Sequence, residues 1–202
     1  MATGQTHNTI PSEASLPEEL GPEPRRILLD LARTAIDFGL THGRPLVVVV
    51  QEYPPLLREA RATFVTLHIK ERLRGCIGSL EPHRPLAADV AHNAYAAAFL
   101  DHRFTPITSR ELGLLDIHIS ILSLPVPMTF RSESDLLAQI RPGVDGLVLE
   151  EQGRRGTFLP SVWESLSNPQ DFLSHLKLKA GLPPNHWSQT VRVARYTTES
   201  FP

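Results

Sequence analysis

Residues 73–80, which read LRGCIGSL, hold the side chains of this chain that are best suited to chemistry. They include Cys76, the single cysteine among 202 residues, with two glycines close to it and an arginine two positions before it. A guanidinium near a thiol favours the reactive thiolate, and glycine lets a ligand or another backbone approach a strand closely. Cys76 is therefore a candidate nucleophile, and Arg74, Gly75 and Gly78 are candidate ligand-binding residues. The alternative is that Cys76 is a small buried residue of the core.

Asp101 and Arg103 form a second candidate group, directly after an alanine-rich stretch that predicts a helix over residues 85–100. One interpretation is a structural ion pair, with the guanidinium favourably placed at the C-terminal end of a helix. The other makes Arg103 an anion-binding group that faces the strand of Cys76, because a guanidinium suits anionic groups. Both residues are therefore candidate ligand-binding residues.

The nine histidines of the chain do not fall into a metal-binding pattern such as His-Glu-x-x-His. His68 and His118 each lie inside a predicted strand and could meet across a sheet, but histidine on a polar strand face is common. A single cysteine also excludes a multi-cysteine zinc site or an iron–sulfur cluster bound by this chain alone. The sequence therefore predicts a protein without a metal site or cofactor.

The elements that must position the thiol are two strands of a predicted hairpin, over residues 64–69 and 73–80. The length of the turn between them decides which way the thiol points. With a loop of two or four residues, Cys76 pairs with Val65 and shares the core face. With a three-residue loop, Cys76 lies on the opposite face, together with Thr66. The sequence leaves both arrangements open.

The rest of the chain mixes helices and strands without a strict β-α-β order. Asn168 is a typical N-cap before Pro169, and Gly181 lies just beyond the end of that helix. The other predicted elements are helices over 24–42 and 132–140, a strand or extended edge over 47–50, and strands over 114–122, 146–151, 156–159 and 190–196. This pattern predicts an α+β fold with a largely antiparallel sheet, helices packed on it and room for a small second lobe.

Composition limits the class of protein. Residues 1–22 have few large apolar side chains, which predicts a flexible tail ahead of one domain over residues 23–202. A net charge of −2 argues against a nucleic-acid binder, and 41% hydrophobic and 21% charged residues are ordinary for a soluble globular protein. No apolar run approaches the ~20 residues that span a bilayer, and the N-terminus lacks the features of a secretory signal. We expect a soluble, cytoplasmic protein.

The chain resembles the AMMECR domain family, which in microbes is known as the A component of the AmmeMemoRadiSam system. The most specific matching segment is LRGCIGSL, and further matching segments follow in the right order, so that the resemblance covers roughly residues 25–200. Ser161 is a departure, because the family commonly has glutamine at this position. The further matching segments are residues 101–106 (DHRFTP), 114–122, 156–163 (GTFLPSVW), 172–173 and 179–182.

The resemblance implies an accessory protein that binds a ligand or partner in a pathway with a Memo-type protein and a radical SAM protein. The alternative is an enzyme that uses Cys76 as nucleophile in a cleft where Arg74 and Arg103 bind an anionic group. A cleft lined by these three residues favours the enzyme. A buried Cys76 beside an exposed apolar patch favours the accessory protein.

Overall fold

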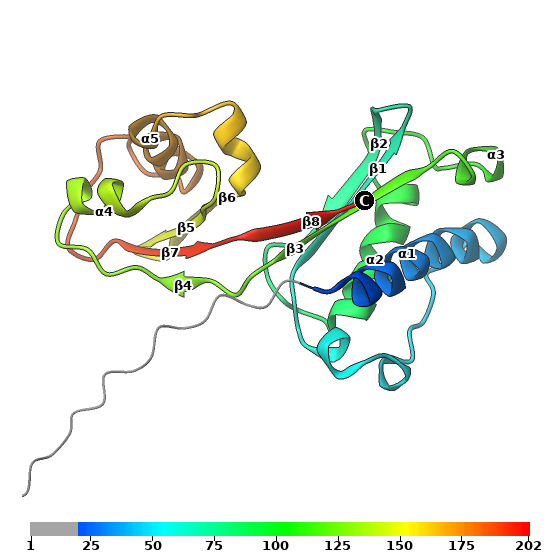
Figure 1. Cartoon of the computed structure of the whole chain (residues 1–202). Helices are drawn as coiled ribbons and strands as arrows, with labels where there is room; N and C mark the ends of the chain where they lie inside the picture. The colour runs from blue at the N-terminus through cyan, green and yellow to red at the C-terminus, as the bar shows by residue number, and fades with distance from the viewer. Residues whose placement is uncertain (1–19) are drawn as a thin grey trace, which may run out of the picture.

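The computed structural model describes residues 20–202 and shows two lobes, each built on its own four-stranded antiparallel sheet (Figure 1). The first sheet has the order β2-β1-β3-β8, and the second has the order β4-β7-β5-β6. The predicted α+β class is confirmed, and the second sheet forms the second lobe. The first lobe contains α1 (Pro22–His42), η1 (Val50–Glu52), η2 (Pro55–Arg58), β1 (Thr63–Ile69), β2 (Arg72–Gly78), α2 (Leu86–Phe99), α3 (Ser109–Leu112), β3 (Asp116–Leu122) and β8 (Thr198–Phe201). The second lobe contains β4 (Val126–Pro127), α4 (Glu133–Gln139), β5 (Gly146–Glu151), β6 (Arg154–Phe158), η3 (Pro160–Glu164), α5 (Pro169–Lys179) and β7 (Arg192–Tyr196).

The predicted tail falls mostly outside the described residues, which begin at Leu20. Leu20 is buried, with 6% of its surface exposed, and its N–H donates to the carboxylate of Glu199 at 3.1 Å. α1 begins at Pro22 rather than at Pro24, and it stops at Gly43, whose φ of 67° suits glycine. Leu20 and Pro22 therefore belong to the folded domain and not to the tail.

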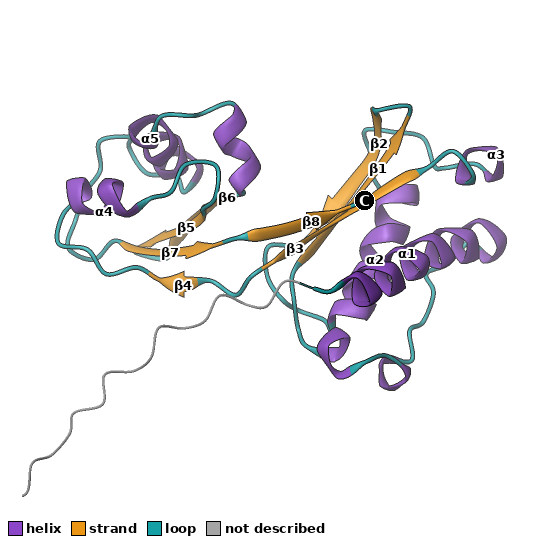
Figure 2. Cartoon of the chain, in the orientation of Figure 1, coloured by secondary structure: helices purple, strands orange, loops and turns teal. Residues whose placement is uncertain are grey.

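Helices α1 and α2 cover one face of the first sheet (Figure 2). Val65, Leu67 and Ile119 point into the core between them and are fully buried. The small side chains of α2 let the helix lie very close to the sheet. A Cβ atom on Gly75 would collide with the carbonyl oxygen of Ala97. Glycine at this position is therefore required by another backbone, which is one of the two reasons that the sequence suggested.

The hairpin of β1 and β2 has a two-residue turn, in which Lys70 and Glu71 have φ values of 50° and 64°. Such a turn alone would pair Val65 with Cys76. A β-bulge between Leu67 and His68, opposite Arg74, shifts the register, so that Thr66 pairs with Cys76 instead. The bulge thus turns Cys76 away from the core, onto the face that the helices leave open.

The second lobe packs α4 and α5 on one face of its sheet (Figure 1). Leu147 and Leu149 of β5 are fully buried against these helices. Trp163 stacks on Phe172 with ring centroids 3.8 Å apart. Asn168 accepts hydrogen bonds from the first turn of α5, which confirms its role as N-cap.

Two segments of the chain, running in opposite directions, connect the lobes. One leads from β3 to β4 and the other from β7 to β8 (Figure 1). Ser123 N–H donates to the carbonyl of Thr197 at 2.9 Å, and Thr197 N–H donates to Ser123 Oγ at 2.9 Å. We call the apolar cluster at this junction the junction core. It consists of Ala62, Leu122, Val148 and Tyr196, with Phe64, Leu80 and Leu159 packed against it.

Three elements differ from the sequence-based expectation. Residues 47–50 form no strand: Val47 is 77% exposed, and the chain turns into η1 at Val50. β4 is only two residues long, too short for an alternating pattern. The predicted strand over 190–196 corresponds to β7, and β8, which was not predicted, follows after a single residue and belongs to the other sheet.

Candidate functional site

A cavity of about 760 Å³ lies where the two lobes face each other. Its floor is the open face of the first sheet, with Cys76, Thr66 and Ser120 in the middle of neighbouring strands. Its opposite wall comes from the second lobe, from the end of β6 through η3. This volume falls in the range of small-molecule sites, about 300–1,000 Å³.

The floor is polar because strand residues alternate between the buried and the open face. Cys76 is half-buried, and its Sγ lies 3.3 Å from Thr66 Oγ1. On the next pair of strands, Ser120 Oγ and Ser200 Oγ are 2.9 Å apart. The floor therefore offers hydroxyl groups and one thiol, and no charged group.

Asp101 and Arg103 hold the backbone of Cys76 at the edge of the sheet. β2 is an edge strand, and the N–H of Cys76 donates to Asp101 Oδ2 at 2.9 Å. Arg103 Nη2 donates to the carbonyl of Cys76 at 3.3 Å and to Asp101 Oδ2 at 2.7 Å. The hydrogen bond from Arg103 holds the pKa of the Asp101 carboxyl well below its usual range. The structure thus brings these three predicted residues together, through the backbone of Cys76.

Arg74 is placed differently. Its guanidinium donates to both carboxylate oxygens of Glu111, at 2.8 and 3.2 Å, and to the carbonyl of Thr105 at 2.7 Å. These hydrogen bonds lower the pKa of Glu111 to about 2. Arg74 is not among the residues that line the cavity. It ties the hairpin to α3 instead.

Gly78 lies opposite Phe64, and a Cβ atom there would collide with the Phe64 ring. Phe64 can therefore lie over β2 and form part of the cavity wall. Gly75 and Gly78, predicted as ligand-binding residues, both make room for parts of the protein itself.

The wall from the second lobe is held by Trp163. Its Nε1–H donates to the carbonyl of Asp145 at 2.7 Å, and Arg141 pairs with the Asp145 carboxylate at 2.6 Å. Ser161 and Glu164, on the same short helix, also line the cavity. Sequence reasoning missed Glu164, although it follows directly after the matched segment 156–163.

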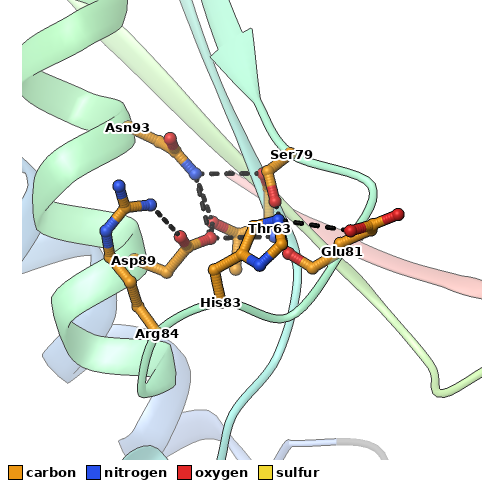
Figure 3. Close-up of polar contacts among 7 residues, drawn as sticks. All are labelled: Thr63, Ser79, Glu81, His83, Arg84, Asp89 and Asn93. Carbon is orange, nitrogen blue, oxygen red and sulfur yellow. Dashed lines mark hydrogen bonds and ion pairs between the residues drawn. The ribbon is translucent and has the colours of Figure 1, made fainter.

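A buried polar network anchors the floor strands to α2 (Figure 3). Asp89, fully buried, accepts hydrogen bonds from Thr63 N–H at 3.1 Å and from Thr63 Oγ1–H at 2.7 Å. Asn93 donates to the same carboxylate oxygen at 3.0 Å, and Arg84 to the other at 3.2 Å. This network fixes the start of β1, because a buried carboxylate is stable only when it is fully hydrogen-bonded.

The loop after β2 connects this anchor to the second lobe. Ser79 donates its hydroxyl to the carbonyl of Glu81, and His83 lies 3.4 Å from the Glu81 carboxylate (Figure 3). Glu81 also pairs with Arg155 of β6. An ion pair therefore links the two lobes in addition to the junction core.

His68 and His118 lie next to each other on neighbouring strands. The rings of His68 and His118 meet edge to face, with centroids 5.3 Å apart. Among residues 20–202, no three histidine, cysteine or acidic side chains gather closely enough to hold a metal ion. None of the helices in the same residues combines the length and apolar character needed to cross a membrane.

Comparison with known proteins gives the family. The AMMECR1 family model matches residues 29–201, which is most of the chain. This chain belongs to the AMMECR1 family. The match includes the Cys76 strand, the Asp101–Arg103 pair and the wall of the cavity, so the predicted family is confirmed.

Two relatives match over nearly their whole length. A protein of Thermofilum pendens is 37% identical, over 90% of this chain and 91% of its own. A protein of Methanothermobacter thermautotrophicus is 37% identical, over 90% of this chain and 95% of its own. The crystal structure of the uncharacterized protein PH0010 from Pyrococcus horikoshii is similar to this chain, with a TM-score of 0.75 at 31% identity, over 90% of this chain and 92% of that one.

Proposed function

We propose that this AMMECR1-family protein binds a small organic molecule in the cavity between its lobes, with Cys76 in contact with it. The observation that carries this proposal is the cavity itself, whose floor and wall come from different lobes. Its size suits a metabolite, and its lining combines apolar and aromatic side chains with hydroxyl groups, a thiol and one carboxylate.

The test compares two serine-to-phenylalanine variants. Ser120→Phe fills the cavity from its open floor without entering the core, whereas Ser109→Phe places the same side chain on exposed α3. The wild-type protein and Ser109→Phe, purified from the native host and desalted, should release the same metabolite in mass spectrometry. Ser120→Phe should release much less. Equal release from all three proteins would place the bound molecule elsewhere, and absence of any bound molecule would count against the proposal.

We further propose that the protein acts in the cytoplasm as the accessory component of a pathway with a Memo-type and a radical SAM protein. Family resemblance supports this role. A single cysteine cannot hold the cluster of a radical SAM enzyme, so this chain would present or carry a ligand for such a partner. Gel filtration of this protein together with the Memo-type and the radical SAM protein, with and without the host metabolites, should show a complex. Three separate peaks under both conditions would contradict the role.

A second candidate function is an enzyme with Cys76 as nucleophile. The position of the thiol in the cavity lining favours it, because a nucleophile must reach its substrate. The part of this hypothesis that assigns anion binding to Arg74 and Arg103 is not retained, because both guanidinium groups are paired with carboxylates. Iodoacetamide should then alkylate the folded wild type much faster than it unfolds, and Ser120→Phe should slow the reaction. Alkylation limited by global unfolding would contradict an accessible nucleophile.

A further inference from the structure

The cavity wall from the second lobe carries three polar side chains in a row, at Ser161, Glu164 and Ser167. Ser161 and Glu164 lie on η3, a 3₁₀-helix, in which residues three apart are stacked on one side. Ser167 follows at the same spacing just beyond the helix. Within the described residues, these three side chains make no hydrogen bond or ion pair with the protein. The row is thus free to bind something else.

The charge of the cavity has one sign. Glu164 is the charged residue of the lining, and within residues 20–202 the lining contains no lysine, arginine or histidine. The two arginines near Cys76 in the sequence do not change this balance, because Arg74 pairs with Glu111 and Arg103 with Asp101. A carboxylate ligand would therefore meet a like charge without a compensating cation, whereas a cation would find an unpaired carboxylate.

Besides this row and the hydroxyl groups and thiol of the floor, the lining is apolar and in part aromatic. Phe64 lies over the floor, and Leu159 and Pro160 precede the polar row. The Trp163 ring is fixed by its stack on Phe172. Such surfaces bind the hydrocarbon or aromatic part of a ligand.

We propose that the cavity takes a ligand with a cationic amine on an apolar or aromatic body, and that Glu164 binds the amine. Ser161, one turn before Glu164, accepts another N–H of the amine, and the body lies between Phe64 and the Trp163 wall. This inference rests on the proposed function, since it names the ligand class for the same cavity.

Three probes with one phenylethyl body separate the charge from the shape: phenylethylamine, phenylethanol and phenylpropionate. Binding is followed by the NMR shifts of Cys76 and Trp163, one on each side of the cavity. The amine should bind more tightly than the carboxylate by about three- to tenfold. Glu164→Gln should weaken the amine by about three- to fivefold and leave the neutral alcohol unchanged. Glu52→Gln, an exposed carboxylate on η1, is the matched control and should change neither.

Two outcomes would overturn the inference while leaving a ligand cavity in place. They are tighter binding of the carboxylate than of the amine, and an amine affinity that Glu164→Gln does not change. A different outcome, in which no probe shifts Cys76 or Trp163, would count against the cavity as a ligand site and so against the proposed function as well.

Discussion

The two arginines near Cys76, Arg74 and Arg103, are both paired with carboxylates. Asp101 accepts hydrogen bonds from the Cys76 N–H and from Arg103, so this pair closes the open edge of β2 at the thiol. Glu111 accepts two hydrogen bonds from Arg74 and also from Thr108 at the start of α3. Each arginine therefore stabilises a turn or an edge of the first lobe. Both guanidinium groups are held by a carboxylate, and neither lines the cavity.

The Arg74–Glu111 pair predicts a pH-dependent stability. The pKa of Glu111 is lowered to about 2 in the folded protein from 4.5, so its contribution is complete above pH 4.5 and is lost as the pH falls toward 2. Arg74→Met should lower the free energy of unfolding at neutral pH by about 1–2 kcal/mol. The variant should also lose less stability than the wild type over that acid range.

Urea unfolding across the acid range measures both effects. Arg72→Met is the matched control, because Arg72 lies exposed at the start of the same strand. An Arg74→Met variant whose stability falls with pH as steeply as that of the wild type would show that the ion pair does not lower the pKa of Glu111.

At the level of the elements, β2 and its contact with α2 hold the floor of the cavity. The bulge at Arg74 turns Cys76 outward, and the missing side chain at Gly75 lets α2 lie directly on the strand. Arg74 thus determines the face on which the Cys76 thiol lies, and Gly75 keeps β2 close to α2. The polar network of Thr63, Asp89 and Asn93 fixes the other end of the same strand pair (Figure 3).

Gly75→Ala tests this close contact. A Cβ atom at this position collides with the backbone of Ala97, so β2 and α2 must separate. We expect a loss of about 2–3 kcal/mol in the free energy of unfolding, as for other overpacked core positions. Gly113→Ala is the control, because Gly113 has an ordinary φ of −71° and a Cβ atom there would meet nothing within 4 Å. Equal stability of the two variants in urea unfolding would show that α2 can move aside freely.

Across the whole molecule, the two lobes are joined by the two chain connections β3–β4 and β7–β8, the junction core and the Glu81–Arg155 ion pair. Leu122 belongs to β3 of the first lobe and packs in the junction core with Val148 and Tyr196 of the second. The ion pair is partly exposed on both sides, so its contribution is small. The apolar contact therefore contributes more than the ion pair, and Phe64 and Leu159 belong both to this contact and to the cavity lining.

Leu122→Ala should destabilise both lobes together by about 2–4 kcal/mol, because it leaves a void in the junction core. Both tryptophans, Trp163 and Trp187, belong to the second lobe, so their fluorescence follows that lobe. Hydrogen exchange of the β1 amides follows the first lobe. Leu178→Ala, at an exposed position of α5, should change little. Two separate transitions in the wild type would show that the lobes unfold independently.

Features that depend on neighbouring residues could be predicted from the sequence alone. Asn168 caps its helix, Ser132 accepts from the N–H of Asp135, and Ile117 and Ile119 alternate with polar residues along β3. A cap or an alternation needs only residues within one turn or one strand, so its signal is present in a short segment. The family signature around Cys76 is local in the same way.

The assembly of the site, by contrast, depends on the tertiary structure. A two-residue turn without a bulge would place Cys76 on the core face. The bulge at Arg74, stabilised by pairing across the sheet, places Cys76 on the opposite face. The partner of Arg74 lies 37 residues away, and Glu164 reaches the cavity from the other lobe. These contacts join segments that are distant in the chain, and their energies depend on packing and register. The sequence could name the thiol, but only the fold shows which residues surround it.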